Sequence, residues 1–109
     1  MPEPRRLPQA SPLVHLLGKK WTIPVIEVLY SSRGSIQFNS IIEAVGGITP
    51  KNLSACLKEL ITAGFVERSE VTSIYYNGLI GTQYSLTKKG AAIHKFIMET
   101  RVVGASLYS

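Results

Sequence analysis

Residues 46–68, which read GGITPKNLSACLKELITAGFVER, decide the fold. Gly46 and Gly47 are expected to end one helix, because glycine enters left-handed backbone conformations without steric cost. Thr49 and Pro50 have the residue types of an N-cap and of the first position of a new helix. The stretch therefore predicts a helix, a tight glycine turn and a second helix, which is the layout of a helix-turn-helix.

The second of these helices, Pro50 to Ala63, is expected to be amphipathic. Ile48 before the cap and Leu53 inside the helix have the spacing of a hydrophobic staple. Gly64 is the expected stop signal. The apolar stripe that should face a core consists of Leu53, Leu57, Leu60 and Ile61. The other side of this helix is then free to contact a partner.

A β-hairpin is predicted next, over 66–73 and 79–86. Asn77-Gly78 between these runs is the strongest short hairpin signal, because both residues accept positive φ. With a two-residue turn there, the expected cross-strand pairs are Tyr76 with Leu79, Val71 with Tyr84, and Ser69 with Leu86.

The remaining elements complete an α+β winged helix-turn-helix, mostly α with a three-stranded antiparallel sheet that includes the wing hairpin. One short strand is expected within 35–38. The expected helices are 13–17, Thr22–Ser31 with Thr22 as N-cap, a helix capped by Asn39 or Ser40 and ending at Val45, and one from Lys88 towards Val103 capped by Thr87. Their expected inward residues are Val25, Ile26, Leu29, Ile41, Ile42, Val45, Ile93, Phe96 and Ile97.

Length and composition fit one domain behind a short arm. Residues 1–12, MPEPRRLPQASP, are proline-rich without periodicity and predict a flexible N-terminal arm, so residues 13–109 form the domain. The 109-residue chain is 45% hydrophobic and 17% charged, as in folded proteins. Its apolar runs are too short to cross a bilayer, and no signal-peptide run precedes them, so we expect a cytoplasmic protein.

Catalytic, metal and cofactor sites are not indicated. Cys56 is the single cysteine, so neither an internal disulfide nor a cysteine zinc site can form. His15 and His94 stand apart from carboxylates at ligand spacing. No nucleophile–histidine–acid grouping or phosphate loop is present. We expect no enzyme and no cofactor.

The charge balance is compatible with a polyanionic partner. A net charge of +5 and a pI near 9.6 permit DNA, RNA or an acidic membrane as a partner, and the charge alone fits an ordinary solvated basic surface equally well. RNA is disfavoured because the aromatic residues form no stacking platform. On Pro50 to Ala63, the residues expected to reach base edges of double-stranded DNA are Lys51, Asn52, Ser54 and Ala55. The expected phosphate contacts are Lys58, Arg33, Arg68, Lys88 and Lys89. The alternative is a winged-helix protein-interaction module in a transcription or replication assembly.

Several blocks of the chain resemble the HxlR-type regulators of the MarR-like superfamily. They are 18–22 (GKKWT), 37–39 (QFN), 47–54 (GITPKNLS), 57–60 (LKEL), 64–68 (GFVER) and 84–90 (YSLTKKG). The blocks follow the family's order over roughly residues 13 to 98. The resemblance implies a homodimeric transcription regulator with a C-terminal dimerisation helix.

Two departures from that family pattern stand out. Many relatives carry a cysteine before the first helix that can act as a thiol switch, and residues 1–20 contain none. We therefore expect Cys56 to be a small buried hydrophobe. The wing tip, SIYYNGLI over 73–80, carries no Lys or Arg. Tyr75 and Tyr76 could cover the hairpin, contact DNA backbone or dock on a protein, and the sequence leaves the three open.

Overall fold

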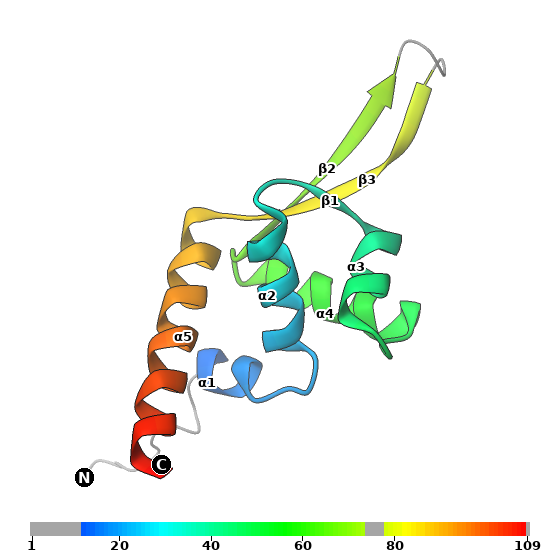
Figure 1. The fold of residues 1–109 in the computed structure, drawn as a ribbon. Helices are drawn as coiled ribbons and strands as arrows, with labels where there is room; N and C mark the ends of the chain where they lie inside the picture. Colours follow the sequence, from blue (N-terminus) through cyan, green and yellow to red (C-terminus); the bar gives the residue numbers. More distant parts are fainter. Residues whose placement is uncertain (1–11, 74–77, 109) are drawn as a thin grey trace, which may run out of the picture.

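The computed structural model describes residues 12–73 and 78–108, and it confirms the winged helix-turn-helix (Figure 1). Five helices surround the base of a three-stranded antiparallel sheet. The elements are α1 (Pro12–Leu17), α2 (Thr22–Ser32), β1 (Ile36–Gln37), α3 (Phe38–Val45), α4 (Pro50–Thr62), β2 (Val66–Ser73), β3 (Gly78–Leu86) and α5 (Lys88–Tyr108). The predicted arm falls almost wholly outside the described residues.

The core forms where α2, α3 and α4 meet. Val25, Ile26 and Leu29 of α2 are buried as expected, and Ile41 of α3 packs with them. The apolar stripe of α4 completes this cluster with Leu53, Leu57 and Leu60. Because one side of α4 is fixed in the core, its other side is held at the surface in a single orientation.

The turn before α4 has the predicted chemistry. Gly46 and Gly47 adopt φ of 72° and 85°, a region that favours glycine. The hydroxyl of Thr49 accepts a hydrogen bond from the amide of Asn52 at 3.1 Å, which confirms the N-cap. Ile48 is buried, as a staple residue should be. The direction in which the chain enters α4 is thus set by the local sequence of the turn and the N-cap.

Two other predicted caps are wrong. Thr22 is the first residue of α2 and is buried, while Trp21 occupies the N-cap without a side-chain hydrogen bond. The Thr22 hydroxyl is instead engaged with the thiol of Cys56 on α4. The N-cap of α3 is Gln37, again without a side-chain bond, and neither Asn39 nor Ser40 caps. The reason is that β1 runs directly into α3, so the helix begins earlier.

The wing strands have nearly the predicted bounds but pair in a different register. The sheet has the order β1-β3-β2, and Ile36 of β1 pairs with Tyr84. Across the wing, the observed pairs are Val66 with Leu86, Arg68 with Tyr84, Ser69 with Gln83, Val71 with Gly81, Thr72 with Leu79 and Ser73 with Gly78. The predicted pairs Val71–Tyr84 and Ser69–Leu86 are therefore wrong, and so is Tyr76–Leu79, because Leu79 pairs with Thr72.

The physical reason lies at the base of the wing. Val66 is buried, and Tyr84 is held by β1 on its other side, so packing fixes the register there. Gly78 pairs with Ser73 inside the sheet, so Asn77-Gly78 is not a two-residue turn. A bulge between Val71 and Thr72 adjusts the ladder further along. Tyr75 and Tyr76 lie outside the described residues.

The last helix extends beyond the body of the molecule (Figure 1). Its predicted cap is confirmed, since the Thr87 hydroxyl accepts a hydrogen bond from the amide of Gly90 at 3.0 Å. Ile97 is buried and Ile93 half-buried. Phe96, which was expected to face inward, is 56% exposed. That prediction is wrong for a single chain, because no element within the described residues covers the Phe96 ring.

Candidate nucleic-acid interface

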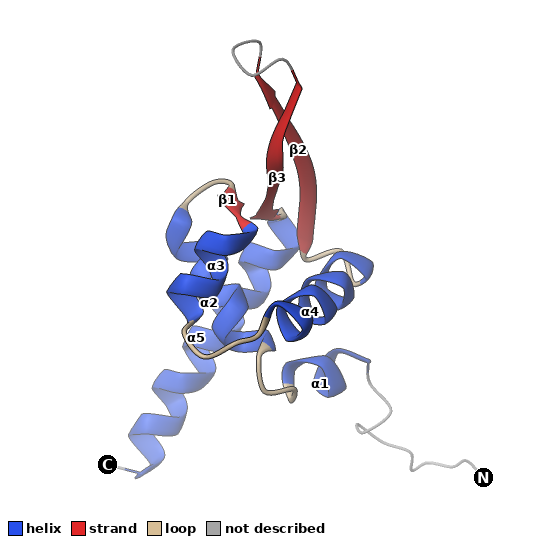
Figure 2. Cartoon of the chain, turned by 90° about the vertical axis from the view of Figure 1, so that its right-hand side faces the viewer, coloured by secondary structure: helices blue, strands red, loops and turns tan. Residues whose placement is uncertain are grey.

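The exposed side of α4 gathers the predicted base-reading residues. Its N-terminal half presents Lys51, Asn52, Ser54 and Ala55 to solvent, and Lys58 follows one turn later. Figure 2 shows α4 below the wing, at the edge of the helical body. A helix with its side chains is about 10–12 Å across, and the DNA major groove is about 12 Å wide. The exposed side of α4 therefore has the size and chemistry to enter that groove.

One flank of α4 borders the wing. A hollow of about 260 Å³ is lined by Ser54 and Lys58 of α4 together with Arg68 and Tyr84 of the wing. The guanidinium of Arg68 lies 3.7 Å from the carboxylate of Glu70, and both side chains are half exposed. The structure thus brings Arg68 beside α4, as a phosphate contact requires.

The other flank borders the turn between α1 and α2. A hollow of about 190 Å³ is lined by residues 19–22 on one side and by Asn52, Ala55, Cys56 and Glu59 on the other. The ammonium of Lys19 lies 2.5 Å from the carboxylate of Glu59. The Lys20 ammonium lies 4.9 Å from the centroid of the Trp21 ring. Sequence reasoning did not place these lysines here, because only the tertiary fold brings this turn against α4.

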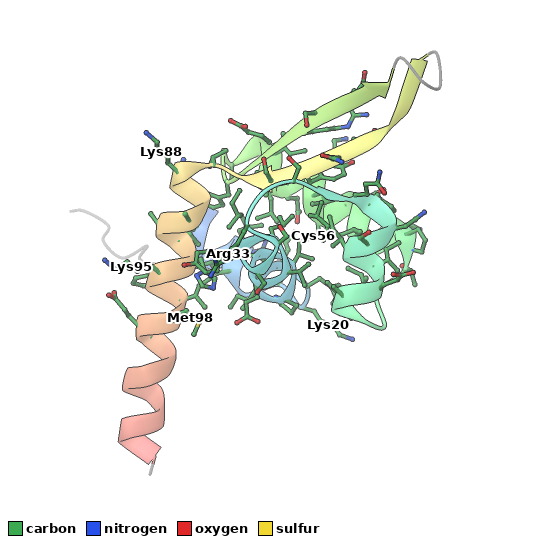
Figure 3. All side chains as sticks on the ribbon, turned by 45° about the horizontal axis from the view of Figure 1, so that its top comes forward. Lys20, Arg33, Cys56, Lys88, Lys95 and Met98 are labelled. Carbon is green, nitrogen blue, oxygen red and sulfur yellow. The ribbon has the colours of Figure 1, made fainter. Side chains whose placement is uncertain are left out.

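Three predicted phosphate contacts lie elsewhere. Arg33 ends α2 in the left-handed conformation, with φ of 54°, beside a hollow shared with β3 and α5. Lys88 begins α5, and Figure 3 shows it on the opposite side of the body from Lys20. The ammonium of Lys89 donates to the carbonyl oxygen of Ala63 at 3.0 Å. Lys89 therefore holds the C-terminal end of α4.

Comparison with known proteins decides the family. A family model described as HxlR-like helix-turn-helix matches residues 16–107. The chain belongs to the HxlR-like helix-turn-helix family. It is therefore a transcriptional regulator and not an enzyme.

Relatives of this HxlR-type chain are described as transcriptional regulators, and those with solved structures share its fold. It is 33% identical to the uncharacterized HTH-type transcriptional regulator YdzF of Bacillus subtilis over 84 residues, 77% of this chain and 72% of YdzF. The reduced form of the regulator YodB from B. subtilis shares 31% identity at a TM-score of 0.74, covering 88% of both chains. The crystal structure of a possible HxlR-family transcriptional factor from Thermoplasma volcanium shares 32% sequence identity at a TM-score of 0.76. The match covers 93% of this chain and 85% of that chain.

A largely apolar groove of this HxlR-type regulator lies beside α5, and its lining includes the polar residues Lys19, Lys58 and Glu59. It measures about 910 Å³ and runs between α1, the C-terminal half of α4 and α5. Leu13, Leu16 and Phe65 contribute apolar walls, and Ala92 and Ile93 of α5 close one side. Phe96 follows Ala92 and Ile93 at helical neighbour spacing, so it extends this apolar surface along α5.

The single thiol of this HxlR-type regulator is shielded. Cys56 is 6% exposed, and its pKa is raised from 9.0 to about 11. Burial is the main cause, followed by the nearby carboxylate of Glu59. The hydrogen bond with Thr22 and the charge of Lys19 act in the opposite direction. The thiolate, which is the reactive form, is therefore disfavoured at neutral pH.

The described residues form neither a metal centre nor a membrane-spanning helix. Within residues 12–73 and 78–108, no three His, Cys, Asp or Glu side chains come together as a metal centre would need. Across the same ranges, no helix has the length and hydropathy to span a membrane.

Proposed function

We propose that the chain is a cytoplasmic, homodimeric regulator that reads a specific double-stranded DNA sequence with α4 in the major groove and the wing beside it. The observation that carries this proposal is the set of exposed side chains in the N-terminal half of α4. Lys51, Asn52, Ser54 and Ala55 all lie on the surface, while the opposite stripe is locked into the core.

Each of these side chains has a partner on base edges. Asn52 can pair bidentately with adenine, and Lys51 can donate to the acceptors of guanine. The methyl group of Ala55 can contact the thymine methyl. Because the N-terminal part of a recognition helix enters deepest, these residues are proposed to read bases.

Phosphate contacts would position the helix without reading sequence. Lys58 and Arg68 border the wing flank of α4, so the geometry favours them. Arg33 and Lys88 are proposed as outer contacts only, since they lie towards α5. Lys89 is bound to Ala63 and would have to leave it to reach DNA.

Dimerisation is proposed through α5 and the groove beside it. The exposed ring of Phe96 continues the apolar wall formed by Ala92 and Ile93, and two-fold symmetric pairs are the commonest oligomers. A two-fold dimer would carry two copies of α4. The expected operator is then a pseudo-palindrome with half-sites roughly 10 bp apart, one helical turn.

A mobility-shift titration tests the DNA proposal. The wild-type chain is expected to retard the duplex upstream of its own gene more strongly than a scrambled duplex. The double variant Lys51→Ala, Asn52→Ala should lose this discrimination and keep its fold, whereas Lys95→Ala on the exposed side of α5 should retain it. Equal discrimination by the double variant and the wild type would contradict the assignment of α4.

Salt dependence separates DNA from the alternative partner. Each neutralised phosphate releases counterion, so affinity for DNA should fall steeply between low and physiological salt. Affinity that stays flat would favour the protein-interaction module. The sequence feature that supports that alternative, the Tyr75–Tyr76 wing tip, lies outside the described residues.

A further inference from the structure

A helix in the major groove has a phosphate backbone on each side of it. The wing serves one side of α4, because Arg68 lies beside Ser54 and Lys58. The opposite side of α4 faces the turn between α1 and α2, where residues 19–22 border Asn52 and Ala55. Among the described residues, this turn borders that side of α4 and is therefore placed to meet the second backbone.

The turn first removes an unfavourable charge. Glu59 is the single acidic residue of α4, and its carboxylate would repel phosphate. The ammonium of Lys19 lies 2.5 Å from that carboxylate, and both side chains are about two-fifths exposed. Lys19 thus neutralises Glu59 and ties the turn before α2 to the C-terminal half of α4.

Lys20 is differently placed. Its side chain is exposed, and no ion pair of Lys20 with a carboxylate occurs within the described part of the chain. Its ammonium lies 4.9 Å from the centroid of the Trp21 ring, a cation–π contact that orients the side chain without neutralising its charge. Trp21 itself reaches the turn before α4, since a Cβ on Gly47 would lie 3.9 Å from its ring.

We propose that Lys20 contacts the DNA phosphate backbone on the side of α4 away from the wing, and that Lys19 is a positioning residue that acts through Glu59. This inference rests on the proposed function, because it assumes that α4 lies in the major groove. It adds a second cationic flank, so that the reading helix is held between Arg68 on one side and Lys20 on the other.

The test is the salt dependence of binding to a random-sequence duplex of roughly 20 bp, about two helical turns. The slope of log affinity against log salt falls by about 0.9 for each phosphate contact removed. Lys20→Gln should reduce the slope by that amount per bound chain, and Lys20→Arg should restore it. Lys95→Gln, which removes the same charge from α5, should leave the slope unchanged (Figure 3).

The role of Lys19 has a separate readout. Lys19→Gln should weaken binding, because it leaves the Glu59 carboxylate facing phosphate, and Glu59→Gln in the same chain should restore binding. Failure of that rescue contradicts the positioning role of Lys19.

Two results distinguish this inference from the proposed function on which it rests. If the wild-type chain binds DNA and Lys20→Gln keeps the wild-type slope, the Lys20 contact is wrong and the proposed function stands. If the wild-type chain binds no duplex at all, both are overturned.

Discussion

Thr87 joins α5 to the chain that follows α4 through its hydrogen bond to Gly64. The Thr87 hydroxyl donates to the carbonyl oxygen of Gly64 at 2.6 Å and accepts from the amide of Gly90 at 3.0 Å. Beside it, the Thr87 amide donates to the carbonyl of Phe65 at 3.0 Å. Backbone carbonyls outside a helix or strand need such partners when the fold shields them from water. The segment that follows α4, the proposed recognition helix, is therefore joined to α5, the proposed dimerisation helix, through Thr87.

The first prediction concerns Gly90 at this joint. A methyl group there would overlap the carbonyl oxygen of Phe65 and lie 2.9 Å from Cδ2 of Leu86. Gly90→Ala should therefore destabilise the fold by about 1–3 kcal/mol, as overpacking does. Thermal unfolding followed by circular dichroism measures this. Gly34→Ala is the control, because a Cβ at Gly34 meets nothing within 4 Å. Equal melting temperatures for the two variants would contradict the steric explanation.

The joint also shows why much of the fold could be predicted from sequence. The signals around α4 are local: Thr49 caps the residue three positions on, and the glycines before it need only their own backbone conformation. Thr87 caps α5 in the same local way. Thr22 failed as a cap because Cys56, distant in sequence, engages its hydroxyl.

The wing and the second flank required tertiary information. The Asn77-Gly78 signal predicts a turn from local sequence alone, whereas the register of the strands follows from packing of Val66 at the base of the sheet. In the same way, nothing in the local sequence around Lys19 and Lys20 indicates that they lie beside α4. The periodicity of α4 predicted which residues are exposed, and it could not predict what lies beside them.

The second prediction tests the proposed dimer. Phe96 is 56% exposed on α5, so a charged residue is tolerated in the single chain and should be excluded from an apolar interface. Phe96→Lys should shift the chain from dimer to monomer in size-exclusion chromatography with light scattering. Ala44→Lys, an equal charge change on exposed α3, should leave the dimer intact. A Phe96→Lys chain that stays dimeric would place the interface elsewhere.

The third prediction concerns reactivity of Cys56. The thiol is buried and its pKa is about 11. Diamide should therefore leave DNA binding unchanged, and iodoacetamide should alkylate the folded chain far more slowly at pH 8 than the guanidinium-unfolded chain. Equal alkylation rates would show that Cys56 is accessible.

The fourth prediction gives the pH dependence of stability. In the unfolded chain the Cys56 thiol ionises near pH 9.0, and in the folded chain near pH 11. Between these values the folded state binds more protons, so the free energy of unfolding should fall as the pH rises from 9 to 11. Urea unfolding across this range measures the fall. Cys56→Ala should show a shallower fall, and an identical pH profile would contradict the shifted pKa.

The last prediction separates stability from binding at Arg33. This residue holds φ of 54°, where a side chain costs about 1–2 kcal/mol and glycine avoids the strain. Part of that gain is offset by the greater backbone entropy that glycine loses on folding. Arg33→Gly should therefore raise the melting temperature by a few degrees, whereas Arg33→Ala, which keeps the Cβ, should not. If Arg33 is an outer phosphate contact, both variants should reduce the salt slope of DNA binding equally. A slope unchanged in both would remove Arg33 from the interface, and a melting temperature lowered by glycine would contradict the strain.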